Sequence, residues 1–266
     1  MVYMTKRIVV GILVACVVGL LVGGLAVYLH VPSVNAPSSH AELPRSTAAT
    51  PKALSLSHTS DIPLLAGDQK QATHPWVLVS KIRPIQPANY IPTDLIKPNV
   101  KTRTDKSEAE QMVRSTIAPS VEKMFVDASA AGYDLMVASG FRSYELQQTY
   151  FTSYASINGA AAANTYSALP GQSEHQTGLA IDISTANSQC YLDICFGETP
   201  AGKWLAANAA NYGFILRYPN DKTAVTQYQY EPWHFRYVGI PLAKALTKSN
   251  LTLDEAQPYF DKAYEQ

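Results

Sequence analysis

The sequence predicts an α+β fold in which helices flank a small antiparallel sheet, preceded by one transmembrane helix and a flexible stalk. Short strand-like runs are mixed with segments of helical spacing, and turn residues separate several of them. An uncharged N-terminal run indicates the membrane helix. At 266 residues and 47% apolar composition, the chain can hold one or two domains and is too apolar for wholesale disorder.

Residues 8–29 form an uninterrupted uncharged run that follows Lys6 and Arg7. A helix of this length spans a hydrocarbon core of about 30 Å. The two basic residues favour a cytoplasmic N-terminus, which places the rest of the chain outside the cell. We therefore expect residues 1–30 to form a cytoplasmic tip and a single-pass anchor. A cleaved signal peptide is the alternative, although its apolar core should be shorter.

Residues 31–75 are rich in Pro, Ser, Ala and Thr and show no sustained period, which is typical of a flexible stalk. The folded domain is then expected to cover residues 76–266, enough for one substantial core. The formal net charge is zero and no strong basic run follows the N-terminus. This balance argues against nucleic acid as a partner, whereas the oligomeric state is left open.

The first helix of this domain is predicted over residues 121–131, where apolar residues recur at helical spacing. Pro119 suits its first turn, and Gly132 is a natural stop. Residues 135–138 then predict a short buried strand. Ser143 is a plausible N-cap for the next helix.

Residues 179–183 alternate as a strand, with Asp182 on the face opposite the three large aliphatic side chains. The remaining elements follow from helical spacing, turn residues and a capping box. They are a helix over 203–212 that ends at Gly213, a strand over 214–218, a turn at 219–222, a strand-like stretch over 228–238 and a final helix that opens at 252–255.

His175, Asp182 and His234 are candidate zinc ligands. Two imidazoles and one carboxylate make the three-ligand set of a catalytic zinc, with a fourth position left for water. The other histidines fall in the predicted anchor and stalk: His30, His40, His58 and His74. An unpaired carboxylate among aliphatic neighbours costs several kcal/mol, so Asp182 needs a cation or many donors. Zinc, Arg142 or a capped loop would each meet this need.

Glu231 lies three residues before His234 and is not needed as a ligand, so it is free to act as a catalytic base. In a regular strand this odd spacing sends the two side chains to opposite faces. Pro232 cannot donate to a ladder, which suggests a break that brings them toward one cleft. The alternative for Glu231 is a surface ion pair with a neighbour such as Arg236.

Arg142 follows Gly140 at the end of a predicted strand, where a loop would present it to a cleft. A guanidinium holds a carboxylate by two parallel hydrogen bonds. An enzyme that trims a peptide C-terminus needs such a clamp. A structural ion pair is the alternative.

Cys190 and Cys195 lie five residues apart in the part expected outside the cell. An oxidising compartment favours a local disulfide between them. Two reduced, partly buried thiols are the alternative.

Several stretches resemble the VanY-type D-alanyl-D-alanine carboxypeptidases, which are zinc peptidases of bacterial cell-wall peptides. The most specific are residues 139–144, 173–182 and 231–237, and weaker likeness extends to residues 92–95, 204–206 and 213–218. The resemblance covers residues 76–266 in the same order. Gln227 is a departure, because similar members often have glycine there, in a turn.

The resemblance implies a metallocarboxypeptidase, a hydrolase of peptide bonds, with one zinc ion held by His175, Asp182 and His234. It also implies Glu231 as the catalytic base and Arg142 on the terminal carboxylate of the substrate. Ser173 and Gln147 are suggested as further substrate contacts.

We therefore expect a membrane-anchored, outward-facing zinc carboxypeptidase that trims the terminal D-alanine from peptidoglycan stem peptides. One alternative is an L,D-carboxypeptidase or an endopeptidase on the same fold, because pocket shape decides which bond is cut. A non-catalytic wall-binding module is the other alternative. Such a module should lack a zinc ligand or the base, and all four residues are present here.

Overall fold

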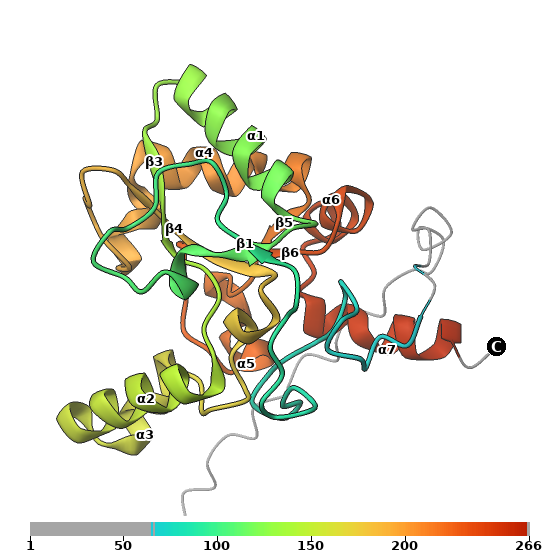
Figure 1. Cartoon of the computed structure of the whole chain (residues 1–266). Helices are drawn as coiled ribbons and strands as arrows, with labels where there is room; N and C mark the ends of the chain where they lie inside the picture. The colour runs from blue at the N-terminus through green and yellow to red at the C-terminus, as the bar shows by residue number, and fades with distance from the viewer. Residues whose placement is uncertain (1–64, 66, 265–266) are drawn as a thin grey trace, which may run out of the picture. The chain divides into compact units, whose positions relative to one another are not determined.

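The computed structural model describes residue 65 and residues 67–264 (Figure 1). The predicted membrane helix at residues 8–29 and most of the predicted stalk lie outside these residues. Within the described part of the chain, no helix is both long and apolar enough to cross a membrane.

The central element of the described part is a four-stranded sheet with the order β3-β4-β6-β5. All neighbouring strands are antiparallel, which confirms the predicted α+β class. A two-stranded antiparallel sheet, β1-β2, precedes it in the chain. The strands are β1 (Leu95–Ile96), β2 (Val113–Arg114), β3 (Leu135–Ser139), β4 (Ala180–Thr185), β5 (Phe214–Leu216) and β6 (His234–Tyr237).

Helices surround this sheet, and Figure 1 shows α1 and α4 together on one side with the α2–α3 pair at the opposite end. The α-helices are α1 (Ala118–Ala130), α2 (Tyr144–Asn158), α3 (Ala160–Tyr166), α4 (Pro200–Asn208), α5 (Thr223–Thr226), α6 (Ile240–Ser249) and α7 (Leu253–Tyr264). Short 3-10 turns join them, of which η3 (Glu174–Thr177) and η4 (Ile194–Glu198) matter for the site.

The predicted helix ends are confirmed by their capping interactions. Pro119 occupies the first turn of α1, and Gly132 follows the helix at a φ of +88°. The Ser143 hydroxyl accepts the amide hydrogen of Leu146 at 3.2 Å and so caps α2. At α7, Thr252 and Glu255 exchange side-chain-to-backbone hydrogen bonds as a capping box.

The predicted strand over residues 228–238 is wrong for its first half. Only residues 234–237 pair in the sheet, because residues 231–234 form a turn closed by the His234 amide and the Glu231 carbonyl at 3.1 Å. The short helix α5 was not predicted; it ends at Gln227, whose φ of +62° explains why glycine suits this position. Helix α4 begins before residue 203 because Thr199 caps it.

The core continues upstream of Trp76, into residues that the composition assigned to the stalk. Ala72 belongs to the main apolar cluster, which is centred on α1, β3 and β4. A second cluster joins Trp76 to α6 and α7, and the Trp76 ring stacks on Phe260 at 5.1 Å. His74 is buried, with its Nδ1 accepting the Trp76 amide hydrogen, so it is a packed histidine rather than a linker residue.

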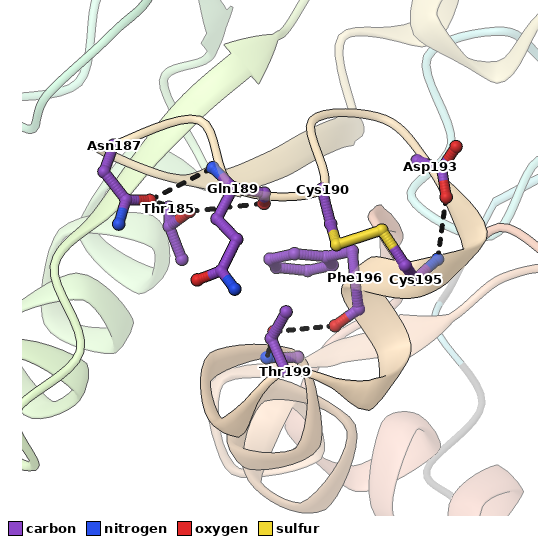
Figure 2. The surroundings of a disulfide bond; sticks show 9 residues. Thr185, Asn187, Gln189, Cys190, Asp193, Cys195, Phe196 and Thr199 are labelled. Atoms are coloured by element: carbon purple, nitrogen blue, oxygen red, sulfur yellow. Dashed lines mark hydrogen bonds between the residues drawn. A yellow bond between two sulfur atoms is a disulfide. The ribbon is translucent and has the colours of Figure 1, made fainter.

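Cys190 and Cys195 are joined by a disulfide in the segment between β4 and α4 (Figure 2). Their Cα atoms lie 5.5 Å apart, within the usual range for such a bond. The disulfide therefore closes a short loop on the N-terminal side of η4.

Candidate active site

Most of the predicted functional residues meet at one cavity of about 310 Å³. This volume is at the lower end of ordinary ligand pockets. The cavity is lined by Arg142, Ser173, His175, Asp182, Glu231 and His234, with aromatic side chains beside them. The fold therefore gathers residues that are as much as 92 positions apart in the sequence.

Strand pairing places two of the zinc candidates side by side. Asp182 of β4 and His234 of β6 are direct antiparallel partners. Side chains at such a pair point to the same face with Cβ atoms about 5 Å apart. His175 comes from η3, and Gly178, at a φ of +67°, turns the chain from η3 into β4.

The three side chains are buried and arranged around a common point. His175 Nε2 lies 3.2 Å from Asp182 Oδ2, and His234 Nδ1 lies 3.1 Å from Asp182 Oδ1. One ligand atom from each residue falls within 4.8 Å of the others. Ligand atoms of a tetrahedral zinc site are about 3.3 Å apart, given bonds of about 2.0–2.1 Å. The spacing and donor types therefore fit zinc.

Hydrogen bonds also set which ring nitrogen is free to bind a metal. His175 Nδ1 lies 2.7 Å from the Gly140 carbonyl oxygen, which can only accept, so Nδ1 carries the hydrogen. The lone pair is thus on Nε2, which faces Asp182. His234 has the opposite orientation, because its Nε2 faces the Glu174 carboxylate at 3.7 Å and its Nδ1 faces Asp182. A hydrogen bond such as that from His175 to Gly140 fixes the orientation and tautomer of the ring.

Gly140 is required at its position for lack of space. A Cβ atom there would lie 2.3 Å from the Met112 carbonyl oxygen. This close packing of the backbone accompanies the hydrogen bond between the Gly140 carbonyl and His175, so Gly140 also helps to orient a candidate metal ligand.

The charges of the site are strongly coupled. Burial opposes ionisation of Asp182, but His175 and His234 outweigh it and hold the pKa of Asp182 well below its usual value. Burial also opposes protonation of His234, yet its contacts with Asp182 and Glu174 raise its pKa to about 9. Without a metal, His234 is therefore an imidazolium at neutral pH, and metal binding must displace its proton.

Glu231 lies beside the ligand group without joining it. Its Oε2 is 3.8 Å from His234 Nδ1, and its side chain is 8% exposed. Burial raises the pKa of Glu231 to about 8. A divalent cation in the site would lower this value and keep the carboxylate ionised. A buried carboxylate tuned in this way suits a group that accepts and returns a proton near neutral pH.

Arg142 faces the pocket in a fixed pose. It donates to Gln147 Oε1 at 2.9 Å and to Ser139 Oγ at 3.0 Å, and it lies over the Tyr150 ring. Its NH2 is 3.8 Å from Asp182 Oδ2. These contacts use two of the five N–H groups of a guanidinium. Arg142 thus keeps donors for a ligand.

The structure places the two other suggested substrate contacts differently. Ser173 is buried and lines the pocket, as expected of a residue near a ligand. Gln147 does not line it. Its side chain is fully occupied, since it accepts from Arg142 and donates to Ser167 Oγ and the Ala168 carbonyl. Gln147 therefore positions Arg142 instead of reaching the pocket itself.

The buried carboxylate of Glu174 was not predicted as part of the site. Its Oε1 accepts from Arg217 at 2.8 Å and from Arg236 at 2.9 Å, and all three side chains are at most 1% exposed. Arg236, the alternative ion-pair partner for Glu231, is therefore paired with Glu174 instead. The sequence did contain a signal for this carboxylate. Arg217 directly follows β5 and Arg236 lies within apolar β6, and a buried arginine needs a buried anion.

The family model for VanY D-alanyl-D-alanine carboxypeptidases matches residues 110–240, which include all the residues of this site. The chain is 44% identical to the putative carboxypeptidase YodJ of Bacillus subtilis (strain 168) over 176 residues, which are 66% of this chain. That match covers 63% of the relative, so the chain spans less than two thirds of its length.

Solved structures are similar as well. The LdcB LD-carboxypeptidase shares 42% identity at a TM-score of 0.63, over 68% of this chain and 84% of that one. A mutant of the vancomycin resistance D,D-pentapeptidase VanY, solved in complex with Zn(II), shares 35% identity at a TM-score of 0.55. The latter match covers 68% of this chain and 97% of the other.

We predict one zinc ion per chain and its loss in His175→Ala and in His234→Ala, because two remaining ligands rarely hold the ion. Elemental analysis of the purified proteins measures this. His74→Asn is the matched control, since His74 is also buried but lies outside the ligand group. Full zinc occupancy in both alanine variants would mean that the metal binds elsewhere.

Zinc affinity should rise with pH up to about pH 9. The pKa of His234 is raised to about 9, so below that value each zinc ion displaces a proton from this ring. Each proton displaced corresponds to about a tenfold gain in affinity per pH unit, and below about pH 8 the release of the Glu231 proton adds to that of His234. Competition with a chelator from pH 6.5 to 8.5 tests this. If zinc affinity stopped rising above pH 7.5, the pKa of His234 would not be raised, and this prediction would be wrong.

Proposed function

Because the chain belongs to the VanY family of D-alanyl-D-alanine carboxypeptidases, we propose that it is a zinc carboxypeptidase of peptidoglycan stem peptides. One observation carries this proposal: the buried His175–Asp182–His234 group shares a cavity with Glu231 and Arg142. A metal site, a base and a carboxylate clamp are the parts that hydrolysis at a peptide C-terminus needs.

In this proposal Arg142 binds the terminal carboxylate of the peptide by paired hydrogen bonds. Gln147 and Ser139 hold the guanidinium from behind, so the carboxylate meets a fixed donor pair instead of a mobile one. The clamp thereby presents the last peptide bond to the metal group. A pocket of about 310 Å³ limits what can lie beyond that bond.

A zinc ion bound by the ligand group supplies Lewis acidity to the scissile carbonyl and makes a neighbouring water molecule more acidic. Glu231 accepts a proton as the water oxygen attacks the carbonyl carbon. It returns that proton to the departing amine nitrogen as the carbon–nitrogen bond breaks. The guanidinium of Arg142 offsets negative charge that develops beside it.

We propose removal of the terminal D-alanine from a D-alanyl-D-alanine end as the reaction. L,D-carboxypeptidase activity is the second candidate, and it is favoured by the 42% identity to the LdcB LD-carboxypeptidase. Mass spectrometry of stem peptides incubated with the protein separates the two. The first activity shortens pentapeptides to tetrapeptides, whereas the second shortens tetrapeptides to tripeptides.

We also propose that residues 8–29 anchor the protein in the cell membrane with the catalytic domain outside. The support is the uncharged run itself and the preceding Lys6 and Arg7. Membrane fractionation and protease accessibility in intact cells test this placement.

Glu231→Gln should keep the zinc ion and lose turnover. Glutamine has nearly the shape of glutamate and can still hydrogen-bond water, but it cannot accept the proton. Turnover should fall by at least about 10²–10⁴-fold, as is typical when a general acid–base group is lost. Zinc content and turnover are measured on one preparation. Lost zinc would make Glu231 a ligand, and near-native turnover would remove it from the mechanism.

Arg142→Lys should raise KM by at least about tenfold with zinc retained, because lysine keeps the charge but loses the planar donor pair. Stem peptides amidated at the C-terminus should be poor substrates of the unaltered protein for the same reason. Initial rates for matched acid and amide peptides measure the effect. Equal cleavage of both would contradict the clamp and favour an endopeptidase.

A further inference from the structure

Leu192 contributes an aliphatic side chain to the pocket. Of residues 190–195, Leu192 is the one that lines the cavity shared with Arg142 and the zinc candidates. It is half-buried and packs at the same time against the main apolar cluster, as does Cys190. A half-exposed leucine in a substrate cavity gains free energy when an apolar group covers it.

The backbone of this loop is unusual. Ser188, Cys190 and Leu192 have φ values of +57°, +53° and +47°, in the left-handed region. Bulky residues rarely adopt this conformation, which persists only where the surroundings enforce it. Leucine at such a position indicates that the local structure holds its side chain in one direction.

Two sets of contacts enforce this conformation. On one side, the disulfide links Cys190 to Cys195, and fully buried Phe196 lies directly beside it (Figure 2). Asp193 Oδ1 accepts the Cys195 amide hydrogen at 2.9 Å. On the other side, the Arg103 guanidinium lies 4.2 Å from the centre of the Tyr191 ring. The loop is therefore held at both ends by the disulfide, and also at Tyr191 by Arg103.

The chain that follows the loop packs against the segment that carries Glu231. A Cβ atom added to Gly197 would lie 2.4 Å from the Tyr230 hydroxyl oxygen and 3.1 Å from Pro232. The chain just after the disulfide thus packs tightly against the turn that presents the base. Leu192, five residues before Gly197, and Glu231 line the same cavity.

We propose that the disulfide-closed segment 190–195 is a specificity element and that Leu192 contacts the small apolar side chain next to the scissile bond. This inference rests on the proposed carboxypeptidase function and names the side-chain class that the pocket selects. The disulfide acts through Leu192 as a positioning device and takes no part in the chemistry. Peptides with a D-alanine methyl group at this position fit, and larger or charged side chains are disfavoured.

Steady-state kinetics of the zinc-loaded full-length protein test the proposal, with stem peptides that end in D-alanine or D-leucine. Leu192→Ala should raise KM for the D-alanine peptide about tenfold and shift the preference toward D-leucine, as expected for methylene groups lost from an apolar pocket. kcat and zinc content should stay within about twofold. Ile194→Ala is the matched control, because Ile194 lies in the same loop but is 51% exposed.

Removing the disulfide gives a second variant that leaves Leu192 in place. Cys190→Ser combined with Cys195→Ser should raise KM in the same direction with unchanged zinc content. Serine replacement is preferable to a reductant, since thiols compete for zinc. Thermal unfolding of each variant shows that the domain remains folded.

The possible failures are distinguishable. If the unaltered protein cleaves stem peptides but Leu192→Ala and the double serine variant keep its KM and its preference, the specificity element is excluded while the function stands. An equal effect of Ile194→Ala would also exclude a specific role for Leu192. If the unaltered, zinc-loaded protein cleaves no stem peptide, the proposed function fails and this inference fails with it.

Discussion

The carboxylate of Glu174 is the centre of a buried ion-pair network that connects several elements of the domain. It is fully buried between Arg217 and Arg236, and its pKa is held well below the usual value because these charges outweigh burial. Arg217 continues to Asp254 at the start of α7, and Arg236 donates to the carbonyls of Pro75 and Val77. Removing one member of such a group leaves a buried charge unpaired, at a cost of about 3–5 kcal/mol.

The same carboxylate links the interior to the metal site. Its Oε1 accepts from both arginines, and its Oε2 faces His234 Nε2. The ion group therefore lies beside the imidazole ring whose Nδ1 faces Asp182. A single buried side chain thus joins β5, β6, α7 and residues 75–77 to one candidate zinc ligand. Stability and site geometry share this interaction, so they cannot be altered independently there.

The antiparallel α+β class, the capped helix ends and the ligand group could be predicted because each follows from local pattern and donor chemistry. Asp182 stood out as a carboxylate in an aliphatic strand, and Ser143 and Thr252 are cap residues at the predicted helix starts. The turn at residues 231–234 was only half predicted. Pro232 indicated a break, but the aromatic residues Tyr228 and Tyr230 before it are typical of a strand, which begins only at His234.

What the sequence could not reveal depends on long-range packing. Glu174 lies next to a ligand in the chain, yet its partners are 43 and 62 residues away, so its role appears only in three dimensions. The family resemblance suggested Gln147 as a substrate contact, but a sequence does not distinguish a residue that touches a ligand from one that holds its neighbour. His74 is buried beside Trp76, and Trp76 packs on the C-terminal helices, which the composition of the predicted stalk does not show.

The pairing of Asp182 with His234 across β4 and β6 has a practical consequence. Side chains alternate between faces with a period of two, so a slip of one residue between these strands would turn one ligand away from the other. A high-affinity site then exists only in molecules whose central strands are correctly paired. The amount of tightly held zinc in a refolded sample would count the molecules with native pairing, where secondary-structure content could not tell the two registers apart.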